Sequence, residues 1–459
     1  MAGVSLGDLL EGPGEEALVH LGDESWTRAE VRATADAVAA RLAAAGVEPG
    51  QAVAVQLPDG VDLVATLFGV WWSGAVYVPV NPRSTADEVD HVLASVEPAA
   101  VVTVDGVAAR TTDRRQEPDV ALISFTSGTT GRPKPVLLRH EGVATLMDGV
   151  LAKMGWTGRD PDKTPMPNLL PVSLSLWAGL YNLIFAFRVG AAVVLLSPFD
   201  TRRFAEAVTR FGIRSTVLPP AAMAMLADDE GITDLAPLRF VRSITAPLSP
   251  LQARRFKDRF GIAVLNSYGQ TEIGGEIIGW NAEDSRAFGE QKLGAVGRPH
   301  EGVQVRADNQ TGELQVVTPA LSAGYADGAD LADRLTDDGW FRTGDVGRVD
   351  DEGFVWIEGR LSDMVNRGGL KVFPAEVEEV LRLHPSVTDV AVAGVPDDRL
   401  GEVPWAWVVR GEGAFDPAEL EAHAREHLAP YKVPAGWTPL AELPRNEVGK
   451  VLLRELRPD

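Results

Sequence analysis

The sequence contains no cysteine among its 459 residues, which excludes disulfide bonds, thiolate metal sites and cysteine nucleophiles. Basic residues are scarce relative to acidic ones: 43 Lys and Arg stand against 65 Asp and Glu, a formal net charge of -22. A surface this acidic repels nucleic-acid phosphates and anionic lipid headgroups. We therefore expect no nucleic-acid partner and no membrane partner, and an anionic ligand must be bound by local geometry.

Segments typical of a secretion signal or a membrane span are also missing. The first twenty residues show no basic start followed by an apolar core. Two uncharged runs, 63–82 and 164–187, reach the length of a membrane helix, but Gly, Pro, Ser or Asn residues interrupt both. We interpret them as buried elements of a large α/β core, and we expect a cytoplasmic protein.

The length and the hydrophobic pattern predict more than one domain. Short β-branched runs near residues 54, 100, 123, 193 and 217 alternate with helical patterns such as 27–45 and 202–211. This alternation predicts a largely parallel sheet with helices on both faces. From Gly294 onward, short strands and turns follow, including a hairpin turn at 350–353. A separate α+β unit begins after residue 361.

The densest chemical motif spans Phe125 to Lys134 and follows an apolar strand. Its small residues free the backbone to wrap an anion, its hydroxyls are donors, and its lysine supplies a point charge for phosphate. The candidate phosphate-binding residues are Thr126, Ser127, Gly128, Thr129, Thr130, Gly131 and Lys134. The spacing differs from a GxxxxGK[ST] loop, and these residues alone suit an ordinary polar turn equally well.

Several further motifs follow in order along the chain. They read NSYGQTE (266–272), GWFRTGD (339–345), GRLSD (359–363), PYKVP (430–434) and PRNEVGK (444–450). With TSGTTGRPKPV (126–136), this ordered set resembles the adenylate-forming superfamily: acyl- and aryl-CoA ligases, peptide-synthetase adenylation domains and luciferases. The resemblance runs from about residue 25 to the C-terminus. It implies ATP-dependent formation of an acyl-adenylate and transfer of the acyl group to a thiol.

The residues of NSYGQTE suit the nucleotide role that the resemblance implies. Tyr268, followed by Gly269, offers an aromatic face for adenine. Thr271 can donate to the α-phosphate, and Glu272 offers a hard oxygen ligand for the Mg²⁺ that bridges ATP phosphates. In isolation, Tyr268 could equally be a core aromatic residue.

The C-terminal motifs imply the remaining roles. Asp345 is expected to accept the ribose hydroxyls, with Arg360 assisting at ribose or phosphate. Lys450 is expected to bridge the carboxylate and the α-phosphate during adenylation. The resemblance further implies that residues 362–459 form a mobile domain that turns about Ser362. It also implies a thiol tunnel beside the glycine pair Gly368 and Gly369.

The resemblance therefore implies a mixed α/β and α+β multidomain fold. A large N-terminal domain of layered αβ sheets with a small β-barrel-like part is expected over residues 1–361, binding ATP and the acid. A small mobile α+β domain carrying the catalytic lysine is expected over residues 362–459.

The sequence departs from the superfamily pattern at several positions. Pro135 stands where a glycine usually follows the loop lysine, and Ser362 stands where the hinge is usually Asp or Lys. Ile244 replaces a glycine that forms the floor of the acyl pocket in plant phenylpropanoid ligases, so we expect a small acid or one that enters at an unusual angle. The pocket candidates, any of which could instead be plain core, are Ser173, Leu174, Trp177, Ile244, Ile273 and Gly274.

The sequence predicts the adenylation reaction, but it leaves several choices for the acid substrate and for the acceptor of the acyl group. No acidic residue occurs from 164 to 187, so the α-ammonium group of an amino acid would lack a partner there. The leading hypothesis is therefore a ligase that uses ATP and Mg²⁺ to join a small non-amino acid to CoA. The alternatives are transfer to a carrier protein or an amine, activation of a very small oxyacid, or a catalytically silent nucleotide-binding regulator.

Overall fold

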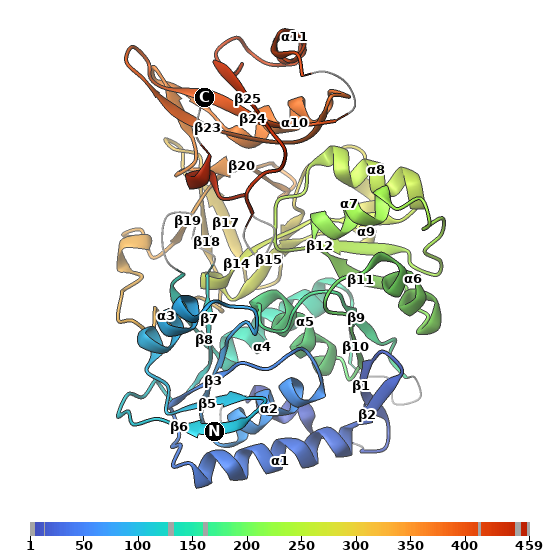
Figure 1. Cartoon of the computed structure of the whole chain (residues 1–459), viewed down its shortest axis with the longest axis vertical. Coiled ribbons are helices and arrows are strands. Elements are labelled where there is room, and N and C mark those ends of the chain that lie inside the picture. Colours follow the sequence, from blue (N-terminus) through green and yellow to red (C-terminus); the bar gives the residue numbers. More distant parts are fainter. Residues whose placement is uncertain are drawn as a thin grey trace. The chain divides into compact units, whose positions relative to one another are not determined.

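The computed structural model describes residues 5–12, 14–126, 133–158, 164–411, 415–445 and 451–456. The chain forms two compact units, coloured along the sequence in Figure 1. Unit 1 comprises Met1–Leu248, Gln252–Gln304 and Val317–Leu335; unit 2 comprises Ser249–Leu251, Val305–Val316 and Thr336–Asp459. The boundary predicted at 361–362 concerns a mobile domain and stays a prediction.

The largest sheet of unit 1 has six strands in the order β6-β5-β3-β4-β7-β8. Its central pairs are parallel, as the alternation of strands and helices predicts, and both edge pairs are antiparallel. The strands are β3 (Ala52–Val55), β4 (Val76–Pro79), β5 (Ala100–Thr103), β6 (Gly106–Ala109), β7 (Val120–Phe125) and β8 (Pro135–Arg139).

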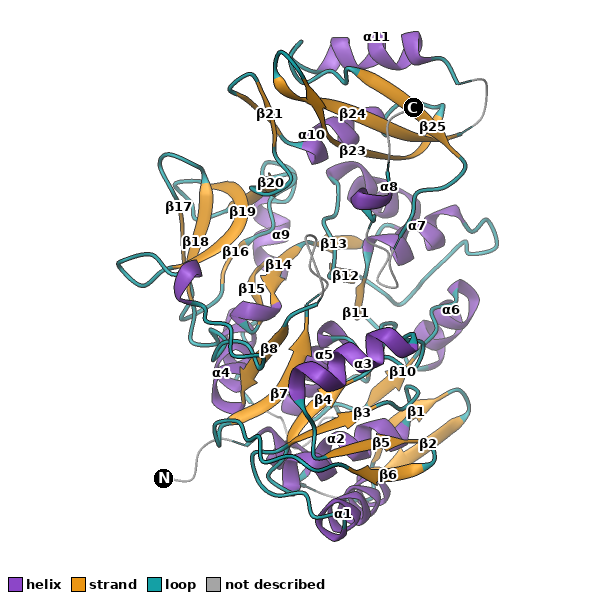
Figure 2. Cartoon of the chain, turned by 60° about the vertical axis from the view of Figure 1, so that its left-hand side comes forward, coloured by secondary structure: helices purple, strands orange, loops and turns teal. Residues whose placement is uncertain are grey.

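The helices near this sheet begin where their sequences provide caps. Helices α1 (Arg28–Ala44) and α3 (Ala86–Val96) each start with a Thr–Glu capping box, formed by Thr27 and Glu30 in α1. Helix α2 (Val61–Trp72) packs closely on α1, and a Cβ on Gly69 would lie 2.7 Å from the Ala35 carbonyl oxygen. Figure 2 shows α3 crossing in front of the sheet.

A second and a third sheet complete the αβ layers of unit 1. The second has the order β2-β1-β10-β9, with β1 (Ala17–Leu21), β2 (Glu24–Thr27), β9 (Asn168–Leu170) and β10 (Val193–Leu195). The third is parallel, with β11 (Ser215–Leu218), β12 (Phe240–Ser243) and β13 (Ala263–Leu265). The accompanying helices are α4 (His140–Lys153), α5 (Trp177–Arg188), α6 (Thr201–Arg210), α7 (Pro220–Asp228) and α8 (Pro250–Phe260).

A small antiparallel sheet carries the NSYGQTE motif. It consists of β14 (Ser267–Gln270), β15 (Gly275–Gly279) and β16 (Arg298–Pro299), with helix α9 (Ala282–Phe288) after β15. A short 3-10 helix, η2 (Thr271–Ile273), joins β14 to β15. The remaining 3-10 helices are η1 (Leu6–Leu10), η3 (Ala332–Arg334) and η4 (Leu453–Glu455).

A four-stranded sheet, β17-β18-β19-β20, and a C-terminal α+β part make up most of unit 2. Strands β17 (Gln304–Ala307), β18 (Glu313–Val317), β19 (Phe341–Val349) and β20 (Val355–Arg360) form the first. The predicted hairpin turn at 350–353 joins β19 to β20. The C-terminal part contains β21 (Val365–Arg367), β22 (Leu370–Val372), α10 (Pro374–Leu381), β23 (Val387–Asp397), β24 (Gly401–Arg410), α11 (Pro417–His427) and β25 (Gly436–Leu440).

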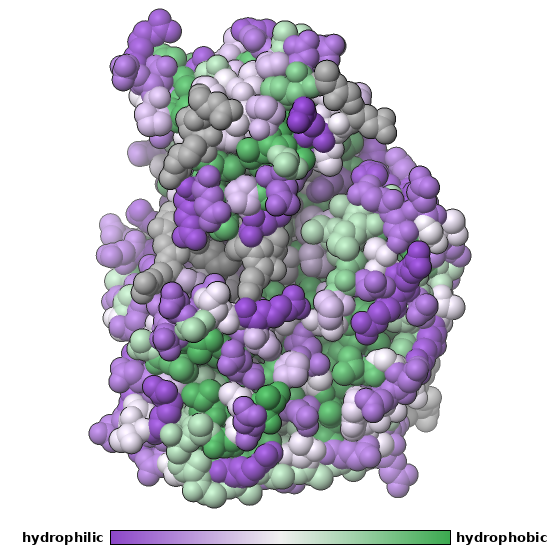
Figure 3. All heavy atoms as spheres, viewed as in Figure 1, coloured by the Kyte–Doolittle hydropathy of each residue, from purple (hydrophilic) through white to green (hydrophobic). Residues whose placement is uncertain are grey.

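The two long uncharged runs fold as interrupted, buried elements. Residues 63–82 form most of α2, a turn and β4, and residues 164–187 form β9 and most of α5. No helix in the described part of the chain is long and apolar enough to cross a bilayer. On the face seen in Figure 3, hydrophilic side chains predominate among the coloured atoms, as the charge of -22 leads one to expect.

A substitution of Phe204 tests how much the hydrophobic core around α6 contributes to the free energy of unfolding. Its side chain is fully buried among aliphatic residues of α6, α7 and the third sheet. Phe204→Ala should lower the free energy of unfolding by about 3–5 kcal/mol, because it removes apolar contacts and leaves a cavity. Urea denaturation followed by circular dichroism measures this change. Arg203→Ala on the exposed face of α6 should change it by less than about 0.5 kcal/mol, and equal losses would contradict the prediction.

Candidate active site

The predicted phosphate loop connects two paired strands rather than a strand and a helix. Phe125 at the end of β7 pairs with Pro135 at the start of β8, and the Thr126 amide donates to the Lys134 carbonyl over 3.0 Å. The base of the loop is therefore a closed hairpin. Five of its predicted ligands, Ser127, Gly128, Thr129, Thr130 and Gly131, lie outside the described residues.

Lys134 and Glu272 belong to one polar cluster around Tyr325. The Lys134 ammonium lies 5.1 Å from the centre of the Tyr325 ring, a cation–π contact. Arg334 interacts with the Tyr325 hydroxyl, and its Nη1 lies 3.3 Å from Glu272 Oε1. Burial raises the pKa of Tyr325, and the charge of Glu272 adds to this rise. The predicted phosphate-binding lysine and the predicted magnesium ligand are thus linked through Tyr325 and Arg334.

The β14–β15 hairpin orients the rest of the NSYGQTE motif. Tyr268 and Gln270 lie on the same face, where Gln270 Nε2 donates to the Tyr268 hydroxyl over 3.1 Å. Gly269 lies on the other face and pairs directly with Glu276. A Cβ on Gly269 would lie 1.8 Å from the Gly275 carbonyl oxygen, so this approach requires glycine. Thr271 and Glu272 follow in η2, on the connection between the strands.

In unit 2, Asp345 and Arg360 are cross-strand partners on β19 and β20. Arg360 Nε lies 3.1 Å from Asp345 Oδ1, and Asp345 is only 4% exposed. The preceding Gly344 has a left-handed φ of 75°, and its amide donates to Glu313 Oε1 over 3.0 Å. The structure thus brings together the two residues predicted to bind ribose and phosphate, and their roles stay predictions.

The predicted hinge and thiol-tunnel residues lie in turns of unit 2. Ser362 is exposed in the turn after β20, where its hydroxyl donates to Asp363 Oδ1 over 2.8 Å. Gly368 and Gly369 form the turn between β21 and β22, with φ values of 60° and 89° that favour glycine. Lys450 lies outside the described residues.

Ser173 and Leu174, two residues of the predicted acid pocket, both form hydrogen bonds with the side chain of Asp59. Asp59, just before α2, accepts hydrogen bonds at Oδ1 from the Leu174 amide over 2.9 Å and from Ser173 Oγ over 3.2 Å. The residues from 164 to 187 could not predict this contact, because Asp59 lies more than a hundred positions earlier in the sequence.

Trp177, at the start of α5, lies against the β14–β15 hairpin. A Cβ on Gly275 would lie 3.4 Å from Trp177 Nε1 and 2.9 Å from the ring of Tyr181. The two aromatic rings make an edge-on contact, with centres 5.7 Å apart. Trp177 therefore lies beside Gly275. The preceding residue, Gly274, has a left-handed φ of 84° and packs against Ala320.

Ile273 and Ile244, the remaining pocket candidates, differ in burial. Ile273 is fully buried in η2, whereas Ile244 is partly buried after β12. Ser243, next to Ile244, accepts a hydrogen bond at its carbonyl from Ser267 Oγ over 2.8 Å. Ile244 therefore lies close to the start of the NSYGQTE strand.

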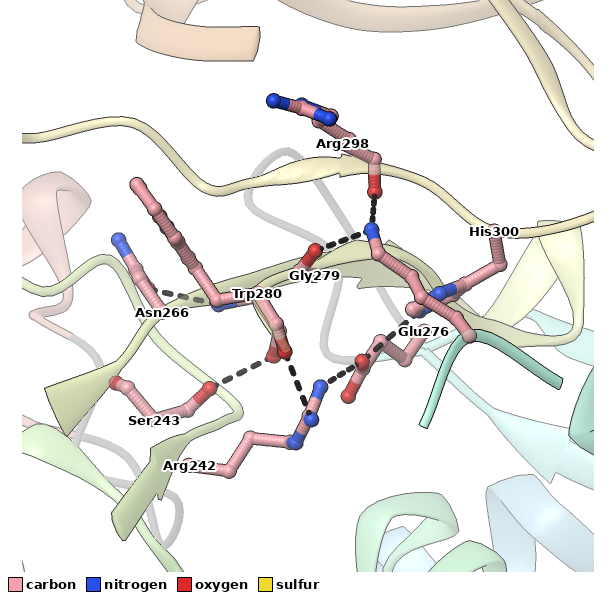
Figure 4. A network of polar contacts seen from close by, with 10 residues as sticks. Arg242, Ser243, Asn266, Glu276, Gly279, Trp280, Arg298 and His300 are labelled. Atoms are coloured by element: carbon pink, nitrogen blue, oxygen red, sulfur yellow. Dashed lines mark hydrogen bonds and ion pairs between the residues drawn. The ribbon is translucent and has the colours of Figure 1, made fainter. Parts of the chain in front are cut away.

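Glu276 organises a buried polar network that no sequence motif indicated (Figure 4). Its Oε1 pairs with Arg242 of β12 and lies 3.0 Å from His300 Nε2. Burial by itself would raise the pKa of Glu276, but Arg242 and the His300 hydrogen bond outweigh burial and lower it. Burial lowers the pKa of His300, so the neutral ring donates from Nε2.

Lys153, the last residue of α4, ties this network to β15 and β16. Its ammonium donates to the Gly279 carbonyl over 2.6 Å and to the Arg298 carbonyl over 2.5 Å. Burial lowers its pKa from 10.5 to about 8, against the opposing pull of Asp284 and Glu276. The network thus contains a lysine that can lose its proton at mildly alkaline pH.

Comparison with known proteins identifies the family. The model of the AMP-binding enzyme family matches residues 10–117 and 104–326, and that of the AMP-binding enzyme C-terminal domain matches residues 376–450. The chain belongs to the AMP-binding enzyme family. The resemblance to adenylate-forming ligases and the multidomain α/β fold class are thereby confirmed.

Individual AMP-binding enzymes resemble this chain over most of its length. Sulfoacetate–CoA ligase of Cupriavidus necator is 32% identical, covering 89% of this chain and 87% of its own. The o-succinylbenzoate CoA synthetase of Bacillus subtilis in complex with its acyl-adenylate is 26% identical, with a TM-score of 0.85 and coverage of 97% and 96%. The amide bond synthetase McbA of Marinactinospora thermotolerans is 28% identical, with a TM-score of 0.84 and 97% coverage of both chains.

Several polar residues near the predicted site of this AMP-binding enzyme belong to none of the sequence motifs. They are Asp59, Arg242, Glu276, His300, Tyr325 and Arg334. One signal in the sequence is the charge of Glu276 in the otherwise apolar run GEIIG, four residues after Glu272. A charged residue that starts a buried strand needs a buried partner, and Arg242 is that partner.

Lys153→Met tests whether burial lowers the pKa of Lys153, because a lowered pKa predicts the direction in which stability changes with pH. Because the folded-state pKa is lowered, Lys153 contributes stability that is fully present above about pH 10.5 and is lost as pH falls through about 8. The free energy of unfolding of the unsubstituted protein, minus that of the variant, should therefore rise between pH 8 and 10.5. Urea denaturation of both proteins at pH 7.5, 9 and 10 measures it, and a pH-independent difference would contradict the assignment.

Proposed function

We propose that this AMP-binding enzyme activates a small carboxylic acid with ATP and Mg²⁺ and transfers the acyl group to CoA. The observation that carries the proposal is the cluster joining Lys134, Tyr325, Arg334 and Glu272 at the base of the phosphate-loop hairpin. The similarity to sulfoacetate–CoA ligase and o-succinylbenzoate CoA synthetase supports CoA as the acceptor.

The residues of this cluster fit ATP with Mg²⁺. Glu272 meets Arg334 through Oε1, and within the described part of the chain no hydrogen bond or ion pair engages Oε2. Mg²⁺ in nucleotide sites is usually held by one or two carboxylates together with phosphate oxygens, so one available carboxylate oxygen suits it. The B. subtilis synthetase is known in complex with ATP and magnesium, which supports the same pair here.

The first half-reaction joins the acid to AMP. A carboxylate oxygen of the acid attacks the α-phosphorus, and the bond from that phosphorus to the bridging oxygen breaks to release pyrophosphate. Thr271 would donate to the α-phosphate, and Lys450 would stabilise the negative charge that develops there. Asp345 would accept the ribose hydroxyls, held in orientation by Arg360.

The second half-reaction transfers the acyl group. The CoA sulfur, having lost its proton, attacks the carbonyl carbon of the adenylate, and AMP leaves with its phosphate oxygen. We propose that rotation about Ser362 separates the half-reactions and that Gly368 and Gly369 line the path of the thiol. We retain the domain division at 361–362 and the cytoplasmic location as predictions.

An amine acceptor is the second candidate. The similarity to the amide bond synthetase McbA favours it. In that case the adenylate forms in the same way, but an amine nitrogen attacks the carbonyl carbon. The bond from that carbon to the phosphate oxygen breaks to release AMP, and the nitrogen loses a proton to solvent to give the amide. The sequence motifs are also compatible with transfer to a carrier protein and with activation of a very small oxyacid.

ATP–pyrophosphate exchange across small aliphatic, aryl and amino acids tests adenylation. Exchange with at least one non-amino acid is expected, and adding CoA should then yield the acyl-CoA with AMP. Exchange without acyl-CoA would contradict CoA as the acceptor, and amide formation with added amines would identify the second candidate. Absence of exchange with every acid would contradict adenylation of such acids.

Lys450→Ala separates the two half-reactions. Adenylation should fall by a factor of about 10²–10³, the usual loss when one donor to a developing charge is removed. Thiolation of chemically prepared acyl-adenylate should be largely retained. Single-turnover assays of each step measure the two rates, and equal losses in both would contradict the assignment of Lys450 to the first step alone.

A further inference from the structure

Within the proposed function, we propose that Glu276 determines which acid is accepted, by receiving a hydrogen bond from a hydroxyl or amino group that the acid carries away from its reacting carboxylate. This inference rests on the proposed adenylation reaction and specifies its substrate class. It follows from the position of Glu276, from its unused oxygen and from the unpartnered polar groups beside it.

Glu276 lies directly across the hairpin from the motif strand. It pairs with Gly269 between Tyr268 and Gln270, and its side chain is on the face opposite these two residues. Because Gly269 has no side chain, nothing on β14 covers the carboxylate on that face. A group bound there lies on the other side of the strand from the predicted adenine-stacking ring.

One oxygen of Glu276 remains available. Arg242 and His300 both bind Oε1, and in the described structure no hydrogen bond or ion pair engages Oε2. Figure 4 shows this second oxygen pointing away from the network. The Glu276 side chain is 11% exposed, and its pKa is lowered, so the carboxylate is ionised. An ionised carboxylate accepts hydrogen bonds only, and leaving it unpaired is costly.

Two aromatic polar groups beside Gly275, the residue before Glu276, are also unpaired within the described part of the chain. Trp177 and Tyr181 are each 8% exposed, and no described residue forms a hydrogen bond with Trp177 Nε1 or the Tyr181 hydroxyl. Both rings face Gly275, the residue before Glu276, and the Glu276 charge contributes to the raised pKa of Tyr181. Buried polar groups in proteins are nearly always paired, so this set points to a polar occupant.

The charge of Glu276 selects the kind of occupant. A second acidic group on the substrate would face an ionised carboxylate and be repelled. A hydroxyl or amino group can instead donate a hydrogen bond to Glu276 Oε2. Arg242 and His300 hold the carboxylate in place, which makes them positioning residues for this contact.

Matched acids test the inference. The acids form two series of nearly equal size: 3-hydroxy-, 3-amino- and 3-methylbenzoate, and 3-hydroxypropanoate, 3-aminopropanoate and butanoate. In one series or both, kcat/KM for ATP–pyrophosphate exchange should be at least about tenfold higher for a hydroxy or amino acid than for its methyl counterpart. The hydroxy and amino arms show which donor is preferred.

Glu276→Gln should reduce that ratio at least about tenfold, because the amide is uncharged and brings its own donors. The matched control is Glu378→Gln on α10, which weakens another partly buried pair, Glu378 with Arg382 at 3.2 Å, in unit 2. It should leave the ratio unchanged. If Glu276→Gln does not fold, the double change Arg242→Met with Glu276→Leu removes both charges together and avoids an unpaired buried arginine.

The outcomes separate this inference from the proposed function. Equal kcat/KM for the donor and methyl acids, or an unchanged ratio in the Glu276 variants, would overturn the inference and assign the space to water. If no acid supports exchange, adenylation of these acids is contradicted, and thermal shifts with the same acids decide the inference. A shift larger for donor acids and lost in Glu276→Gln supports it, and equal shifts overturn it.

Discussion

The close approach of β14 and β15 is the constraint on which the predicted site depends. The two strands pack so tightly at Gly269 that a single Cβ would overlap the Gly275 carbonyl oxygen. This contact sets the pairing of Gly269 with Glu276, and a slip of one residue would move every side chain to the opposite face. Tyr268 and Glu276 take opposite faces of the hairpin because of this register, and η2 presents Thr271 and Glu272 at its end.

The network beneath β15 anchors the hairpin to the surrounding sheets. Arg242 belongs to β12, Lys153 ends α4, and His300 follows β16, so three elements converge on Glu276 and Gly279. Buried ion pairs add little net stability, but removing one partner costs several kcal/mol. We therefore infer that the main effect of the network is to fix the position of the Glu276 carboxylate. Recognition of a small polar group on a substrate requires such a fixed position.

A protein with a formal charge of -22 must bind ATP through local cations. The cations at the predicted nucleotide residues are all held by neighbours in the described part of the chain: Lys134 lies over Tyr325, Arg334 contacts Glu272, and Arg360 contacts Asp345. Such contacts limit the freedom of the side chains before a ligand arrives, which reduces the entropy lost on binding. The surrounding acidity then opposes unspecific association with other polyanions.

The amino-acid sequence was sufficient to predict the alternation of strands and helices, the hairpin at 350–353 and the order of the adenylate-forming motifs. Such features depend on local periodicity, turn chemistry and short spacings. It also pointed to Lys134, Glu272, Asp345 and Arg360, which lie inside motifs. Three contacts became visible only in the folded chain: Ser173 donates to Asp59, Tyr325 links Lys134 to Arg334, and Glu276 pairs with Arg242. The Arg242–Glu276, Ser173–Asp59 and Lys134–Tyr325 contacts join residues 34, 114 and 191 positions apart, and a side chain's partner across such distances is set by the packing of whole elements, which no local pattern records.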